Sequence, residues 1–351
     1  MDRTRLEEEL DGLAAELDFA GVVRVDHPDH ETLAKAHGSA HRGYAIPNAV
    51  DTRLAVASMT KGFTALAVVS LIEQRAIELE TTARSLLGTD LPMIPEDVTI
   101  EHLLAHRSGI GDYLDEELHP DVAEYVMPVP VHELATPEEY LVVLGGHPAA
   151  FTPGTQFAYN NGAYVVLAIL AERAGGVPYH DLLVERIFRR AGMHDTDFPR
   201  SDELAGAVAQ GYIEADGRVR SNVLHLPVRG VGDGGAYSTV ADMRSFWTRL
   251  YAGDIVSPDW VAEMVRPRSD APDQGRRYGL GFWLHSSSDV VFLEGADAGI
   301  SARSVHEPST GLTYTVIANS SDGAWPILEF LGDRLGAPAE SPVVDEASAS
   351  A

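Results

Sequence analysis

Ser58 and Lys61 are the two residues of this sequence whose types and spacing most clearly suggest chemistry. They have two residues between them, as Ser58-Met59-Thr60-Lys61, at the start of an apolar stretch that predicts a buried helix. Residues three positions apart on a helix share a face, so the amine would reach the hydroxyl. A serine becomes a nucleophile when an adjacent base takes its proton, and free N–H groups at a helix N-terminus suit the oxyanion of acyl transfer. The alternative interpretation is a serine that caps the helix, followed by a surface lysine.

The scarcity of lysine favours a chemical role for Lys61. The 26 basic side chains are 24 arginines and only two lysines, Lys35 and Lys61. Arginine can replace lysine wherever a surface charge is all that matters, but a guanidinium group does not give up a proton. A lysine that persists in such a chain is therefore a candidate for proton transfer.

Two further segments could complete an acyl-transfer site. Tyr159 and Asn161 follow a Pro-Gly turn and precede a predicted helix. A tyrosine near a lysine loses its phenolic proton more easily and can act as general base or acid, while the asparagine could hold the lysine or bind a substrate carbonyl. A later segment has the pattern of an edge strand whose glycine lets a ligand approach and whose backbone N–H could be an oxyanion donor. Its residues are Leu293, Glu294, Gly295 and Ala296. Taken singly, both segments also fit ordinary packing.

Other polar residues have simpler explanations. His102 and His106 are four apart on a predicted helix, as on a metal-binding face, but no third ligand follows at a recognisable spacing. Asp297 could pair with Glu294 as acid and base, although ordering its own turn is the simpler role. Tyr113 could line the pocket or pack within its loop. We therefore predict neither a metal nor a cofactor.

The elements that must position these residues come from both ends of the chain. An opening helix over 3–18 precedes strands over 19–26 and 31–38, and the apolar helix over 58–76 follows. Residues 77–200 are rich in helix signals, most clearly over 160–174 and 179–191. Strand patterns return over 278–284, 290–294, 301–307 and 312–319, before a last helix over 325–335.

This order predicts an α/β (α+β) sandwich, in which an antiparallel sheet built from both chain ends is flanked by helices and carries an inserted, mainly helical region. We assign one catalytic domain to residues 1–337. Its sheet part covers about 1–76 and 205–337, and its helical part covers about 77–204. Residues 338–351 are small and acidic, which predicts a disordered tail.

The composition excludes several kinds of partner. The formal net charge of −27 argues against nucleic acid and against an anionic membrane surface, because both need a basic footprint. The chain has no cysteine, which excludes disulfides and thiolate chemistry. Its first residues are densely charged and lack the apolar core of a signal peptide, and no stretch approaches the roughly 18 apolar residues of a membrane span. We expect a cytoplasmic protein, and the oligomeric state stays open.

Together, these motifs resemble those of the superfamily of serine β-lactamases, penicillin-binding proteins and related esterases, which follow the order S-x-x-K, Y-x-N and K/H-x-G. The nearest branch has tyrosine in the second motif and includes class C β-lactamases, a D,D-carboxypeptidase type and family VIII carboxylesterases. The similarity covers about residues 15–335. Connecting segments resemble the branch as well, namely LAVASMTKGFTALAV (54–68), LLAHRSGIGDY (103–113), FTPGTQFAYNNGAYVVLAILAERAGG (151–176), RRAGMHDTDF (189–198) and GDGGAYSTVADM (232–243).

The resemblance implies a role for each motif residue. Ser58 would be the nucleophile and Lys61 its hydrogen-bonded partner, Tyr159 the general base or acid, and Asn161 a positioning group. The backbone N–H groups of Ser58 and Ala296 would form the oxyanion hole. Whether the lysine or the tyrosine is the base is left open, since such assignments are disputed even in related enzymes.

The third motif departs from the family pattern. Leu293 stands where relatives carry the Lys or His that helps to receive a substrate carboxylate, and Glu294 stands beside it. This pair should disfavour anionic substrates. The sequence therefore predicts a serine hydrolase that forms an acyl-serine and acts on an uncharged ester or amide, or transfers the acyl group to another acceptor. The alternatives are a β-lactamase or D-amino-acid peptidase, and a non-catalytic binding module of the same fold.

Overall fold

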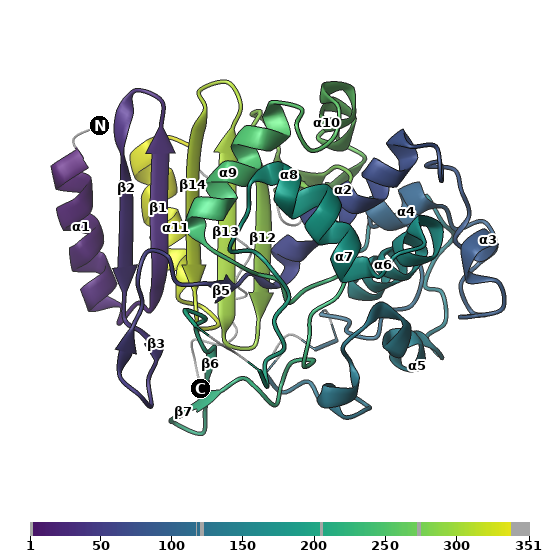
Figure 1. Cartoon of the computed structure of the whole chain (residues 1–351), viewed down its shortest axis with the longest axis horizontal. Coiled ribbons are helices and arrows are strands. Elements are labelled where there is room, and N and C mark those ends of the chain that lie inside the picture. The colour runs from purple at the N-terminus through teal and green to yellow at the C-terminus, as the bar shows by residue number, and fades with distance from the viewer. Residues whose placement is uncertain (1–2, 117, 120–122, 204–205, 272–274, 338–351) are drawn as a thin grey trace.

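An eight-stranded antiparallel sheet forms the centre of the computed structural model, which describes residues 3–116, 118–119, 123–203, 206–271 and 275–337 (Figure 1). Its strand order is β2-β1-β14-β13-β12-β11-β10-β9. The first strand of the chain, β1, therefore pairs directly with the last strand, β14, and the predicted fold class is confirmed. The strands are β1 (Gly21–His27), β2 (His30–His37), β9 (Ser269–Ala271), β10 (Arg276–Tyr278), β11 (Trp283–His285), β12 (Val291–Asp297), β13 (Ile300–Glu307) and β14 (Leu312–Ala318).

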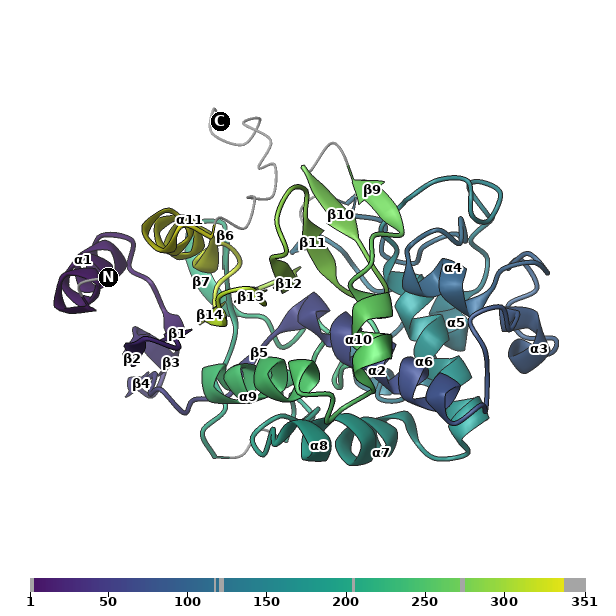
Figure 2. The same ribbon diagram turned by 90° about the horizontal axis from the view of Figure 1, so that it is seen from above.

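Helices cover both faces of this sheet. Seen from above, α1 (Arg3–Glu16) and α11 (Ala324–Leu335) lie on one face, and α9 (Val240–Tyr251) lies on the other (Figure 2). Alternate residues of a strand point to opposite faces, so neighbouring side chains of β12 enter different cores. Phe292 belongs to the core beneath α1 and α11, whereas Leu293 belongs to the larger core that contains α2 (Thr60–Glu73).

The helical region packs beside the end of the sheet that lies opposite β2 and β1 (Figure 1). Its central helix is α6 (Asn161–Gly175), which contacts α2, α4 and α7 and is buried on most sides. The remaining helices are α3 (Ala83–Leu87), α4 (Ile100–Leu104), α5 (Leu141–Leu144), α7 (Tyr179–Leu183), α8 (Arg189–Ala191) and α10 (Pro258–Met264), with 3-10 turns at Ala57–Met59, Val131–Glu133 and Pro137–Tyr140 and a π turn at Val184–Phe188. Within the described residues, no helix is long and apolar enough to cross a membrane.

Three short sheets complete the structure. They pair β3 (Ser39–His41) with β4 (Ile46–Pro47), β5 (Leu54–Ala55) with β8 (Tyr237–Ser238), and β6 (Tyr212–Ala215) with β7 (Arg218–Ser221). The β5–β8 pair ties the segment before α2 to residues far along the chain. The tail predicted over 338–351 lies outside the described residues.

Several predicted elements differ from the structure. The strand expected over 278–284 is a hairpin of β10 and β11, because Gly281 adopts a positive φ of 86° and the N–H of Gly279 bonds to the carbonyl of Phe282. The strand with Leu293 is not at an edge, since β12 lies between β11 and β13. However, only residues 291 and 292 of β12 pair with β11, so its second half is bonded to β13 alone. The helix expected over 58–76 begins as the 3-10 turn at Ala57–Met59 and ends at Glu73.

Candidate active site

Ser58 lies in the 3-10 turn between β5 and α2, and this turn packs against β12. The preceding residue, Ala57, has a positive φ of 44°, which is rare for a residue with a side chain. The turn is held by bonds at both ends. The N–H of Val56 donates to the carbonyl of Ala236 at 2.9 Å, and the hydroxyl of Thr60 donates to the carbonyl of Ala57 at 2.7 Å. Strained backbone positions of this kind often occur at functional sites.

Gly295 allows β12 to touch the backbone of the nucleophile. A Cβ atom at this position would lie 2.2 Å from the carbonyl oxygen of Val56 and 2.7 Å from the amide nitrogen of Ser58. Only a residue without a side chain fits so close an approach. The next residue, Ala296, is exposed in the cavity beside Ser58. The structure therefore brings together the two residues that the resemblance named as oxyanion donors.

We expect Gly295→Ala to lower kcat/KM for a short p-nitrophenyl ester by at least about 10²-fold, because displacing β12 by about 1 Å misaligns the site. Gly43→Ala is the matched control, since a Cβ there would have nothing within 4 Å. Circular dichroism would check that both variants are folded. Wild-type kinetics in a folded Gly295→Ala variant would contradict the close contact.

Lys61 is buried and makes three short hydrogen bonds through its Nζ atom. The partners are the Oγ atom of Ser58, the Oδ1 atom of Asn161 and the main-chain carbonyl of Asp233, each at 2.8 Å. Burial lowers the pKa of Lys61, although the charges of Asp233 and Glu116 oppose this effect. The amine is therefore held at the nucleophile in a setting that weakens its affinity for a proton.

The start of α6 fixes Asn161. Its Nδ2 group donates to the carbonyl of Leu114 at 3.0 Å and to the carboxylate of Glu116 at 2.8 Å, so both ends of the amide are bonded. The Asp112 carboxylate accepts the N–H groups of Asn161 and Gly162 at 2.6 and 2.8 Å. Burial raises the pKa of Asp112 more than these hydrogen bonds lower it, so the pKa is raised to about 7.

Aromatic rings hold Tyr159. Its ring lies 4.4 Å from the ring of His106 and stacks on Trp283 with an interplanar angle of 12°, and the Nζ atom of Lys61 is 4.8 Å from its centre. Burial raises the pKa of Tyr159 well above its usual value, and the negative charge of Glu116 adds to this, whereas a hydrogen bond with Ser58 acts in the opposite direction. The tyrosine is therefore a neutral phenol at neutral pH.

His102 and His106 were expected on one face of a helix, as in a metal site, and this placement is wrong. The helix α4 ends at Leu104, and His106 has a positive φ of 54°, so the two rings do not share a helical face. The His102 side chain accepts the N–H of Thr99 in a capping box, and His106 accepts the N–H of Asn160 at 3.1 Å. Burial lowers the pKa of His106 well below its ordinary value, so it is a neutral ring beside Tyr159.

Tyr113 lies next to the site and is bonded to a residue that sequence reasoning missed. Its hydroxyl donates to the Asp233 carboxylate at 2.5 Å, and Asp233 supplies the carbonyl that accepts from Lys61. Burial raises the pKa of Asp233, while the positive charge of Lys61 lowers it. The segments containing Asp112 and Asp233 were part of the resemblance, but their roles depend on loop contacts that no residue spacing indicates.

The expected roles of Leu293 and Glu294 are wrong. Leu293 is 2% exposed and packs against Gly62 on α2, where the missing Cβ leaves room for its side chain. Glu294 points to the opposite face of the sheet and forms ion pairs with Arg276 at 2.7 Å and with Arg303. Burial would raise the pKa of Glu294, but the two guanidinium groups hold it below its ordinary value. Neither residue lines the cavity at Ser58, and Glu294 is not paired with Asp297.

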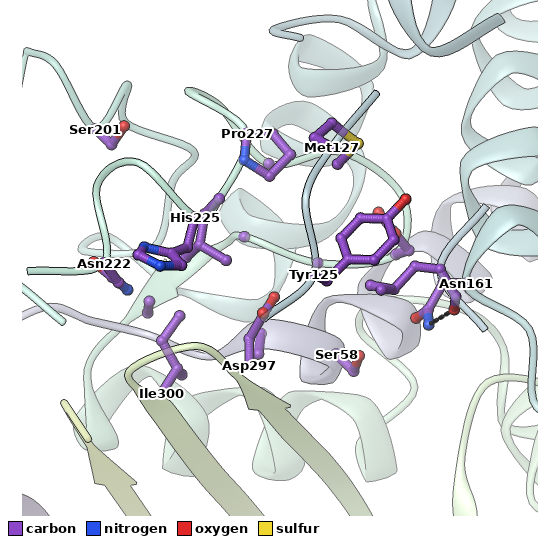
Figure 3. Close-up of a pocket in the computed structure, with 18 of the residues that line it drawn as sticks. Ser58, Tyr125, Met127, Asn161, Ser201, Asn222, His225, Pro227, Asp297 and Ile300 are labelled. Carbon is purple, nitrogen blue, oxygen red and sulfur yellow. Dashed lines mark hydrogen bonds between the residues drawn. The ribbon is translucent and has the colours of Figure 1, made fainter. Parts of the chain in front are cut away.

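A cavity opens directly over Ser58 (Figure 3). One part of its wall is apolar and includes Met127, Leu226 and Ile300. The acidic residues in the wall are Glu116, Asp233 and Asp297, and among the described residues of the lining there is no lysine or arginine. In Figure 3 the Asp297 carboxylate points into the space between Ser58 and His225. The wall therefore carries negative charge close to the nucleophile.

The chain is similar to known proteins over most of its length. A family model described as Beta-lactamase matches residues 6–327. Penicillin-binding protein 4* of Bacillus subtilis (strain 168) is 26% identical over 341 residues, which are 91% of this chain and 72% of that protein.

Solved structures show the same similarity. The crystal structure of a penicillin-binding protein from Bacillus halodurans has a TM-score of 0.86 and 30% identity, covering 93% of this chain and 99% of the other. An octameric penicillin-binding protein homologue from Pyrococcus abyssi has a TM-score of 0.82 and 25% identity, covering 99% of this chain and 81% of the other.

Proposed function

The chain belongs to the Beta-lactamase family and is a serine hydrolase, and we propose that it works through an acyl intermediate on Ser58. The observation that carries this proposal is the 2.8 Å contact between Lys61 Nζ and Ser58 Oγ at the floor of a cavity. In the first step the hydroxyl oxygen attacks an ester or amide carbonyl, the serine proton passes to a base, and the alcohol or amine departs. Water then releases the acyl group. An alcohol or amine in place of water would give acyl transfer.

The hydrogen bonds of Lys61 support the lysine as the base. Two of its three partners, the carbonyl oxygens of Asn161 and Asp233, can only accept hydrogen bonds. A neutral amine has two hydrogens for these two oxygens and a lone pair left for the third direction, which faces Ser58. The lowered pKa of Lys61 favours that neutral form, whereas the raised pKa of Tyr159 favours a phenol that keeps its proton.

Tyr159 is then suited to protonate the leaving group, regaining the proton that Lys61 took from Ser58. Its hydroxyl is hydrogen-bonded to Ser58, and its ring is fixed by the tilted ring of His106 and the stacked ring of Trp283. The oxyanion that develops on the substrate carbonyl would accept the N–H groups of Ser58 and Ala296. Preorganised donors of this type are worth about 10²–10³-fold in rate.

The charge of the cavity supports a substrate without a carboxylate at the reacting end. Its wall includes three acidic side chains and, in the described part, no lysine or arginine. A substrate carboxylate would meet repulsion there and lose the charge-assisted hydrogen bond that a cation provides. The acidic wall of the cavity, rather than Leu293 and Glu294, is therefore the feature that disfavours an anionic substrate. A cytoplasmic location stays a prediction of the sequence.

We expect the enzyme to hydrolyse a short p-nitrophenyl ester with a kcat/KM about 10- to 100-fold above that for nitrocefin, a β-lactam with a carboxylate. The ratio follows from the loss of a charged hydrogen bond, which is worth about 1.5–3 kcal/mol. Absorbance assays of both substrates with the same enzyme stock would measure it. Hydrolysis of nitrocefin as efficiently as the ester would instead favour the β-lactamase alternative.

A further inference from the structure

Asp297 lines the cavity next to Ser58 and Ala296. It is the last residue of β12 and directly follows Ala296, the proposed oxyanion donor. One of its carboxylate oxygens accepts the N–H of Ala298 at 2.8 Å, which orders the turn into β13. Its carboxylate also faces the space above Ser58 (Figure 3). Because Asp297 follows the proposed oxyanion donor and lines the same cavity, its carboxylate could reach a group attached to the carbon next to the reacting carbonyl.

The surroundings of Asp297 are unfavourable for its negative charge. Burial raises the pKa of Asp297 to about 7, and the nearby charges of Glu116 and Asp233 raise it further than Lys61 can offset. Asp233 is already bonded to Tyr113 and Glu116 to Asn161. A cation that entered the cavity would relieve the repulsion among these carboxylates, since opposite charges within about 4–6 Å favour each other's charged forms.

We propose that Asp297 determines substrate specificity by binding a protonated amine on the acyl part of the substrate, next to the reacting carbonyl. This inference rests on the proposed function and narrows its substrate from an ester or amide without a carboxylate at the reacting end to an aminoacyl ester or amide. The apolar residues Met127, Leu226 and Ile300 in the same wall suit an apolar side chain on that acyl group. The acyl group is thus an amino acid residue with an apolar side chain and a free amine.

The test compares the ethyl esters of D- and L-phenylalanine with ethyl 3-phenylpropanoate, which lacks only the amine. We expect wild-type enzyme to prefer one phenylalanine ester over the amine-free ester by at least about 10-fold in kcat/KM. Asp297→Asn keeps an acceptor for the Ala298 N–H and should reduce this preference by about 10- to 100-fold. Asp216→Asn is the matched control, because it removes one negative charge from an exposed turn between β6 and β7 and should leave the preference unchanged.

The pH dependence of the wild-type enzyme gives a second test that needs no variant. The ion pair requires ionised Asp297, whose pKa is about 7, and a protonated α-amine, whose pKa is about 7.7–8.0. The preference for the amine should therefore be greatest between these values and decline on both sides. Because it is a ratio to the amine-free ester, ionisation of Lys61 cancels.

The outcomes separate this inference from the proposed function. If Ser58 reacts with a fluorophosphonate and ethyl 3-phenylpropanoate is hydrolysed as well as both phenylalanine esters, the inference is overturned and the proposed function stands. The inference is also overturned if Asp297→Asn leaves the preference for the amine intact. Should that variant not fold, a wild-type preference that is flat across the pH range overturns the inference instead. If Ser58 is not labelled and no ester is hydrolysed, the proposed function itself fails.

Discussion

Ser58→Ala is expected to abolish ester hydrolysis and labelling by a fluorophosphonate probe while leaving the protein folded. A nucleophile that acts as a unit with its base contributes at least about 10³-fold to kcat, which corresponds to about 4 kcal/mol of transition-state stabilisation. The structure supports an intact fold, because the turn around Ser58 is held by main-chain bonds of Val56 and by the hydroxyl of Thr60 rather than by the serine side chain. Mass spectrometry of the labelled protein and ester kinetics would measure both effects.

Ser201 provides the control for this experiment. It lines the same cavity, so a probe that enters reaches both serines. The three hydrogen bonds of Lys61 go elsewhere, and a serine without an adjacent base is a poor nucleophile. Ser201→Ala should therefore retain labelling and most of the activity. Probe attached to another residue of the Ser58→Ala protein would refute the assignment of the nucleophile.

The parts of the site that could be predicted are those that local spacing determines. Ser58 and Lys61 meet because they are three positions apart on one helical turn, whatever the rest of the fold does. The carbonyl of Asp233 and the carboxylate of Asp112 reach the same place through loops distant in sequence. A main-chain carbonyl has no side-chain signature, so its role as a partner of Lys61 could not be predicted from residue types.

Leu293 illustrates a different limit. Leu293 and Gly295 share a face of β12, since strand residues two apart point the same way. Whether that side chain reaches the cavity depends on the helix packed behind it. Gly62 on α2 leaves a space that the leucine fills, and the predicted contact with substrate is replaced by a core contact.

Short strands and glycine turns caused parts of the sheet to be predicted wrongly from the sequence pattern. The hairpin of β10 and β11 was expected as one strand, because the glycine conformation that turns the chain at Gly281 is not visible in an apolar run. Without these short strands, β12 looked like an edge. The helix α9 was also missed, although Thr239 accepts the N–H of Asp242 as its N-cap, a pattern that the sequence does contain.

Lys61→Arg is expected to be nearly as damaging as Lys61→Ala, with kcat lowered by about 10³-fold in each, even though the arginine preserves positive charge. The proposed base must lose a proton, and guanidinium does not do so in proteins. Its planar fork also cannot reproduce three bonds that converge on one nitrogen from Ser58, Asn161 and Asp233. Burial lowers the pKa of Lys61, so wild-type kcat/KM should rise with pH through that lowered pKa, and neither variant should show this rise.

Lys35 is the ideal control, because it is the other lysine of the chain. It is partly exposed on β2 and forms ion pairs with Asp11 at 3.1 Å and with Glu7 at 2.5 Å, which arginine can also form. Surface ion pairs contribute about 0–1 kcal/mol, so Lys35→Arg should change neither stability nor kcat appreciably. A Lys61→Arg enzyme that kept more than about a tenth of the wild-type kcat would have lost less than ~1.4 kcal/mol. In that case only the charge of Lys61 would matter, and the proton would have to pass to Tyr159 instead.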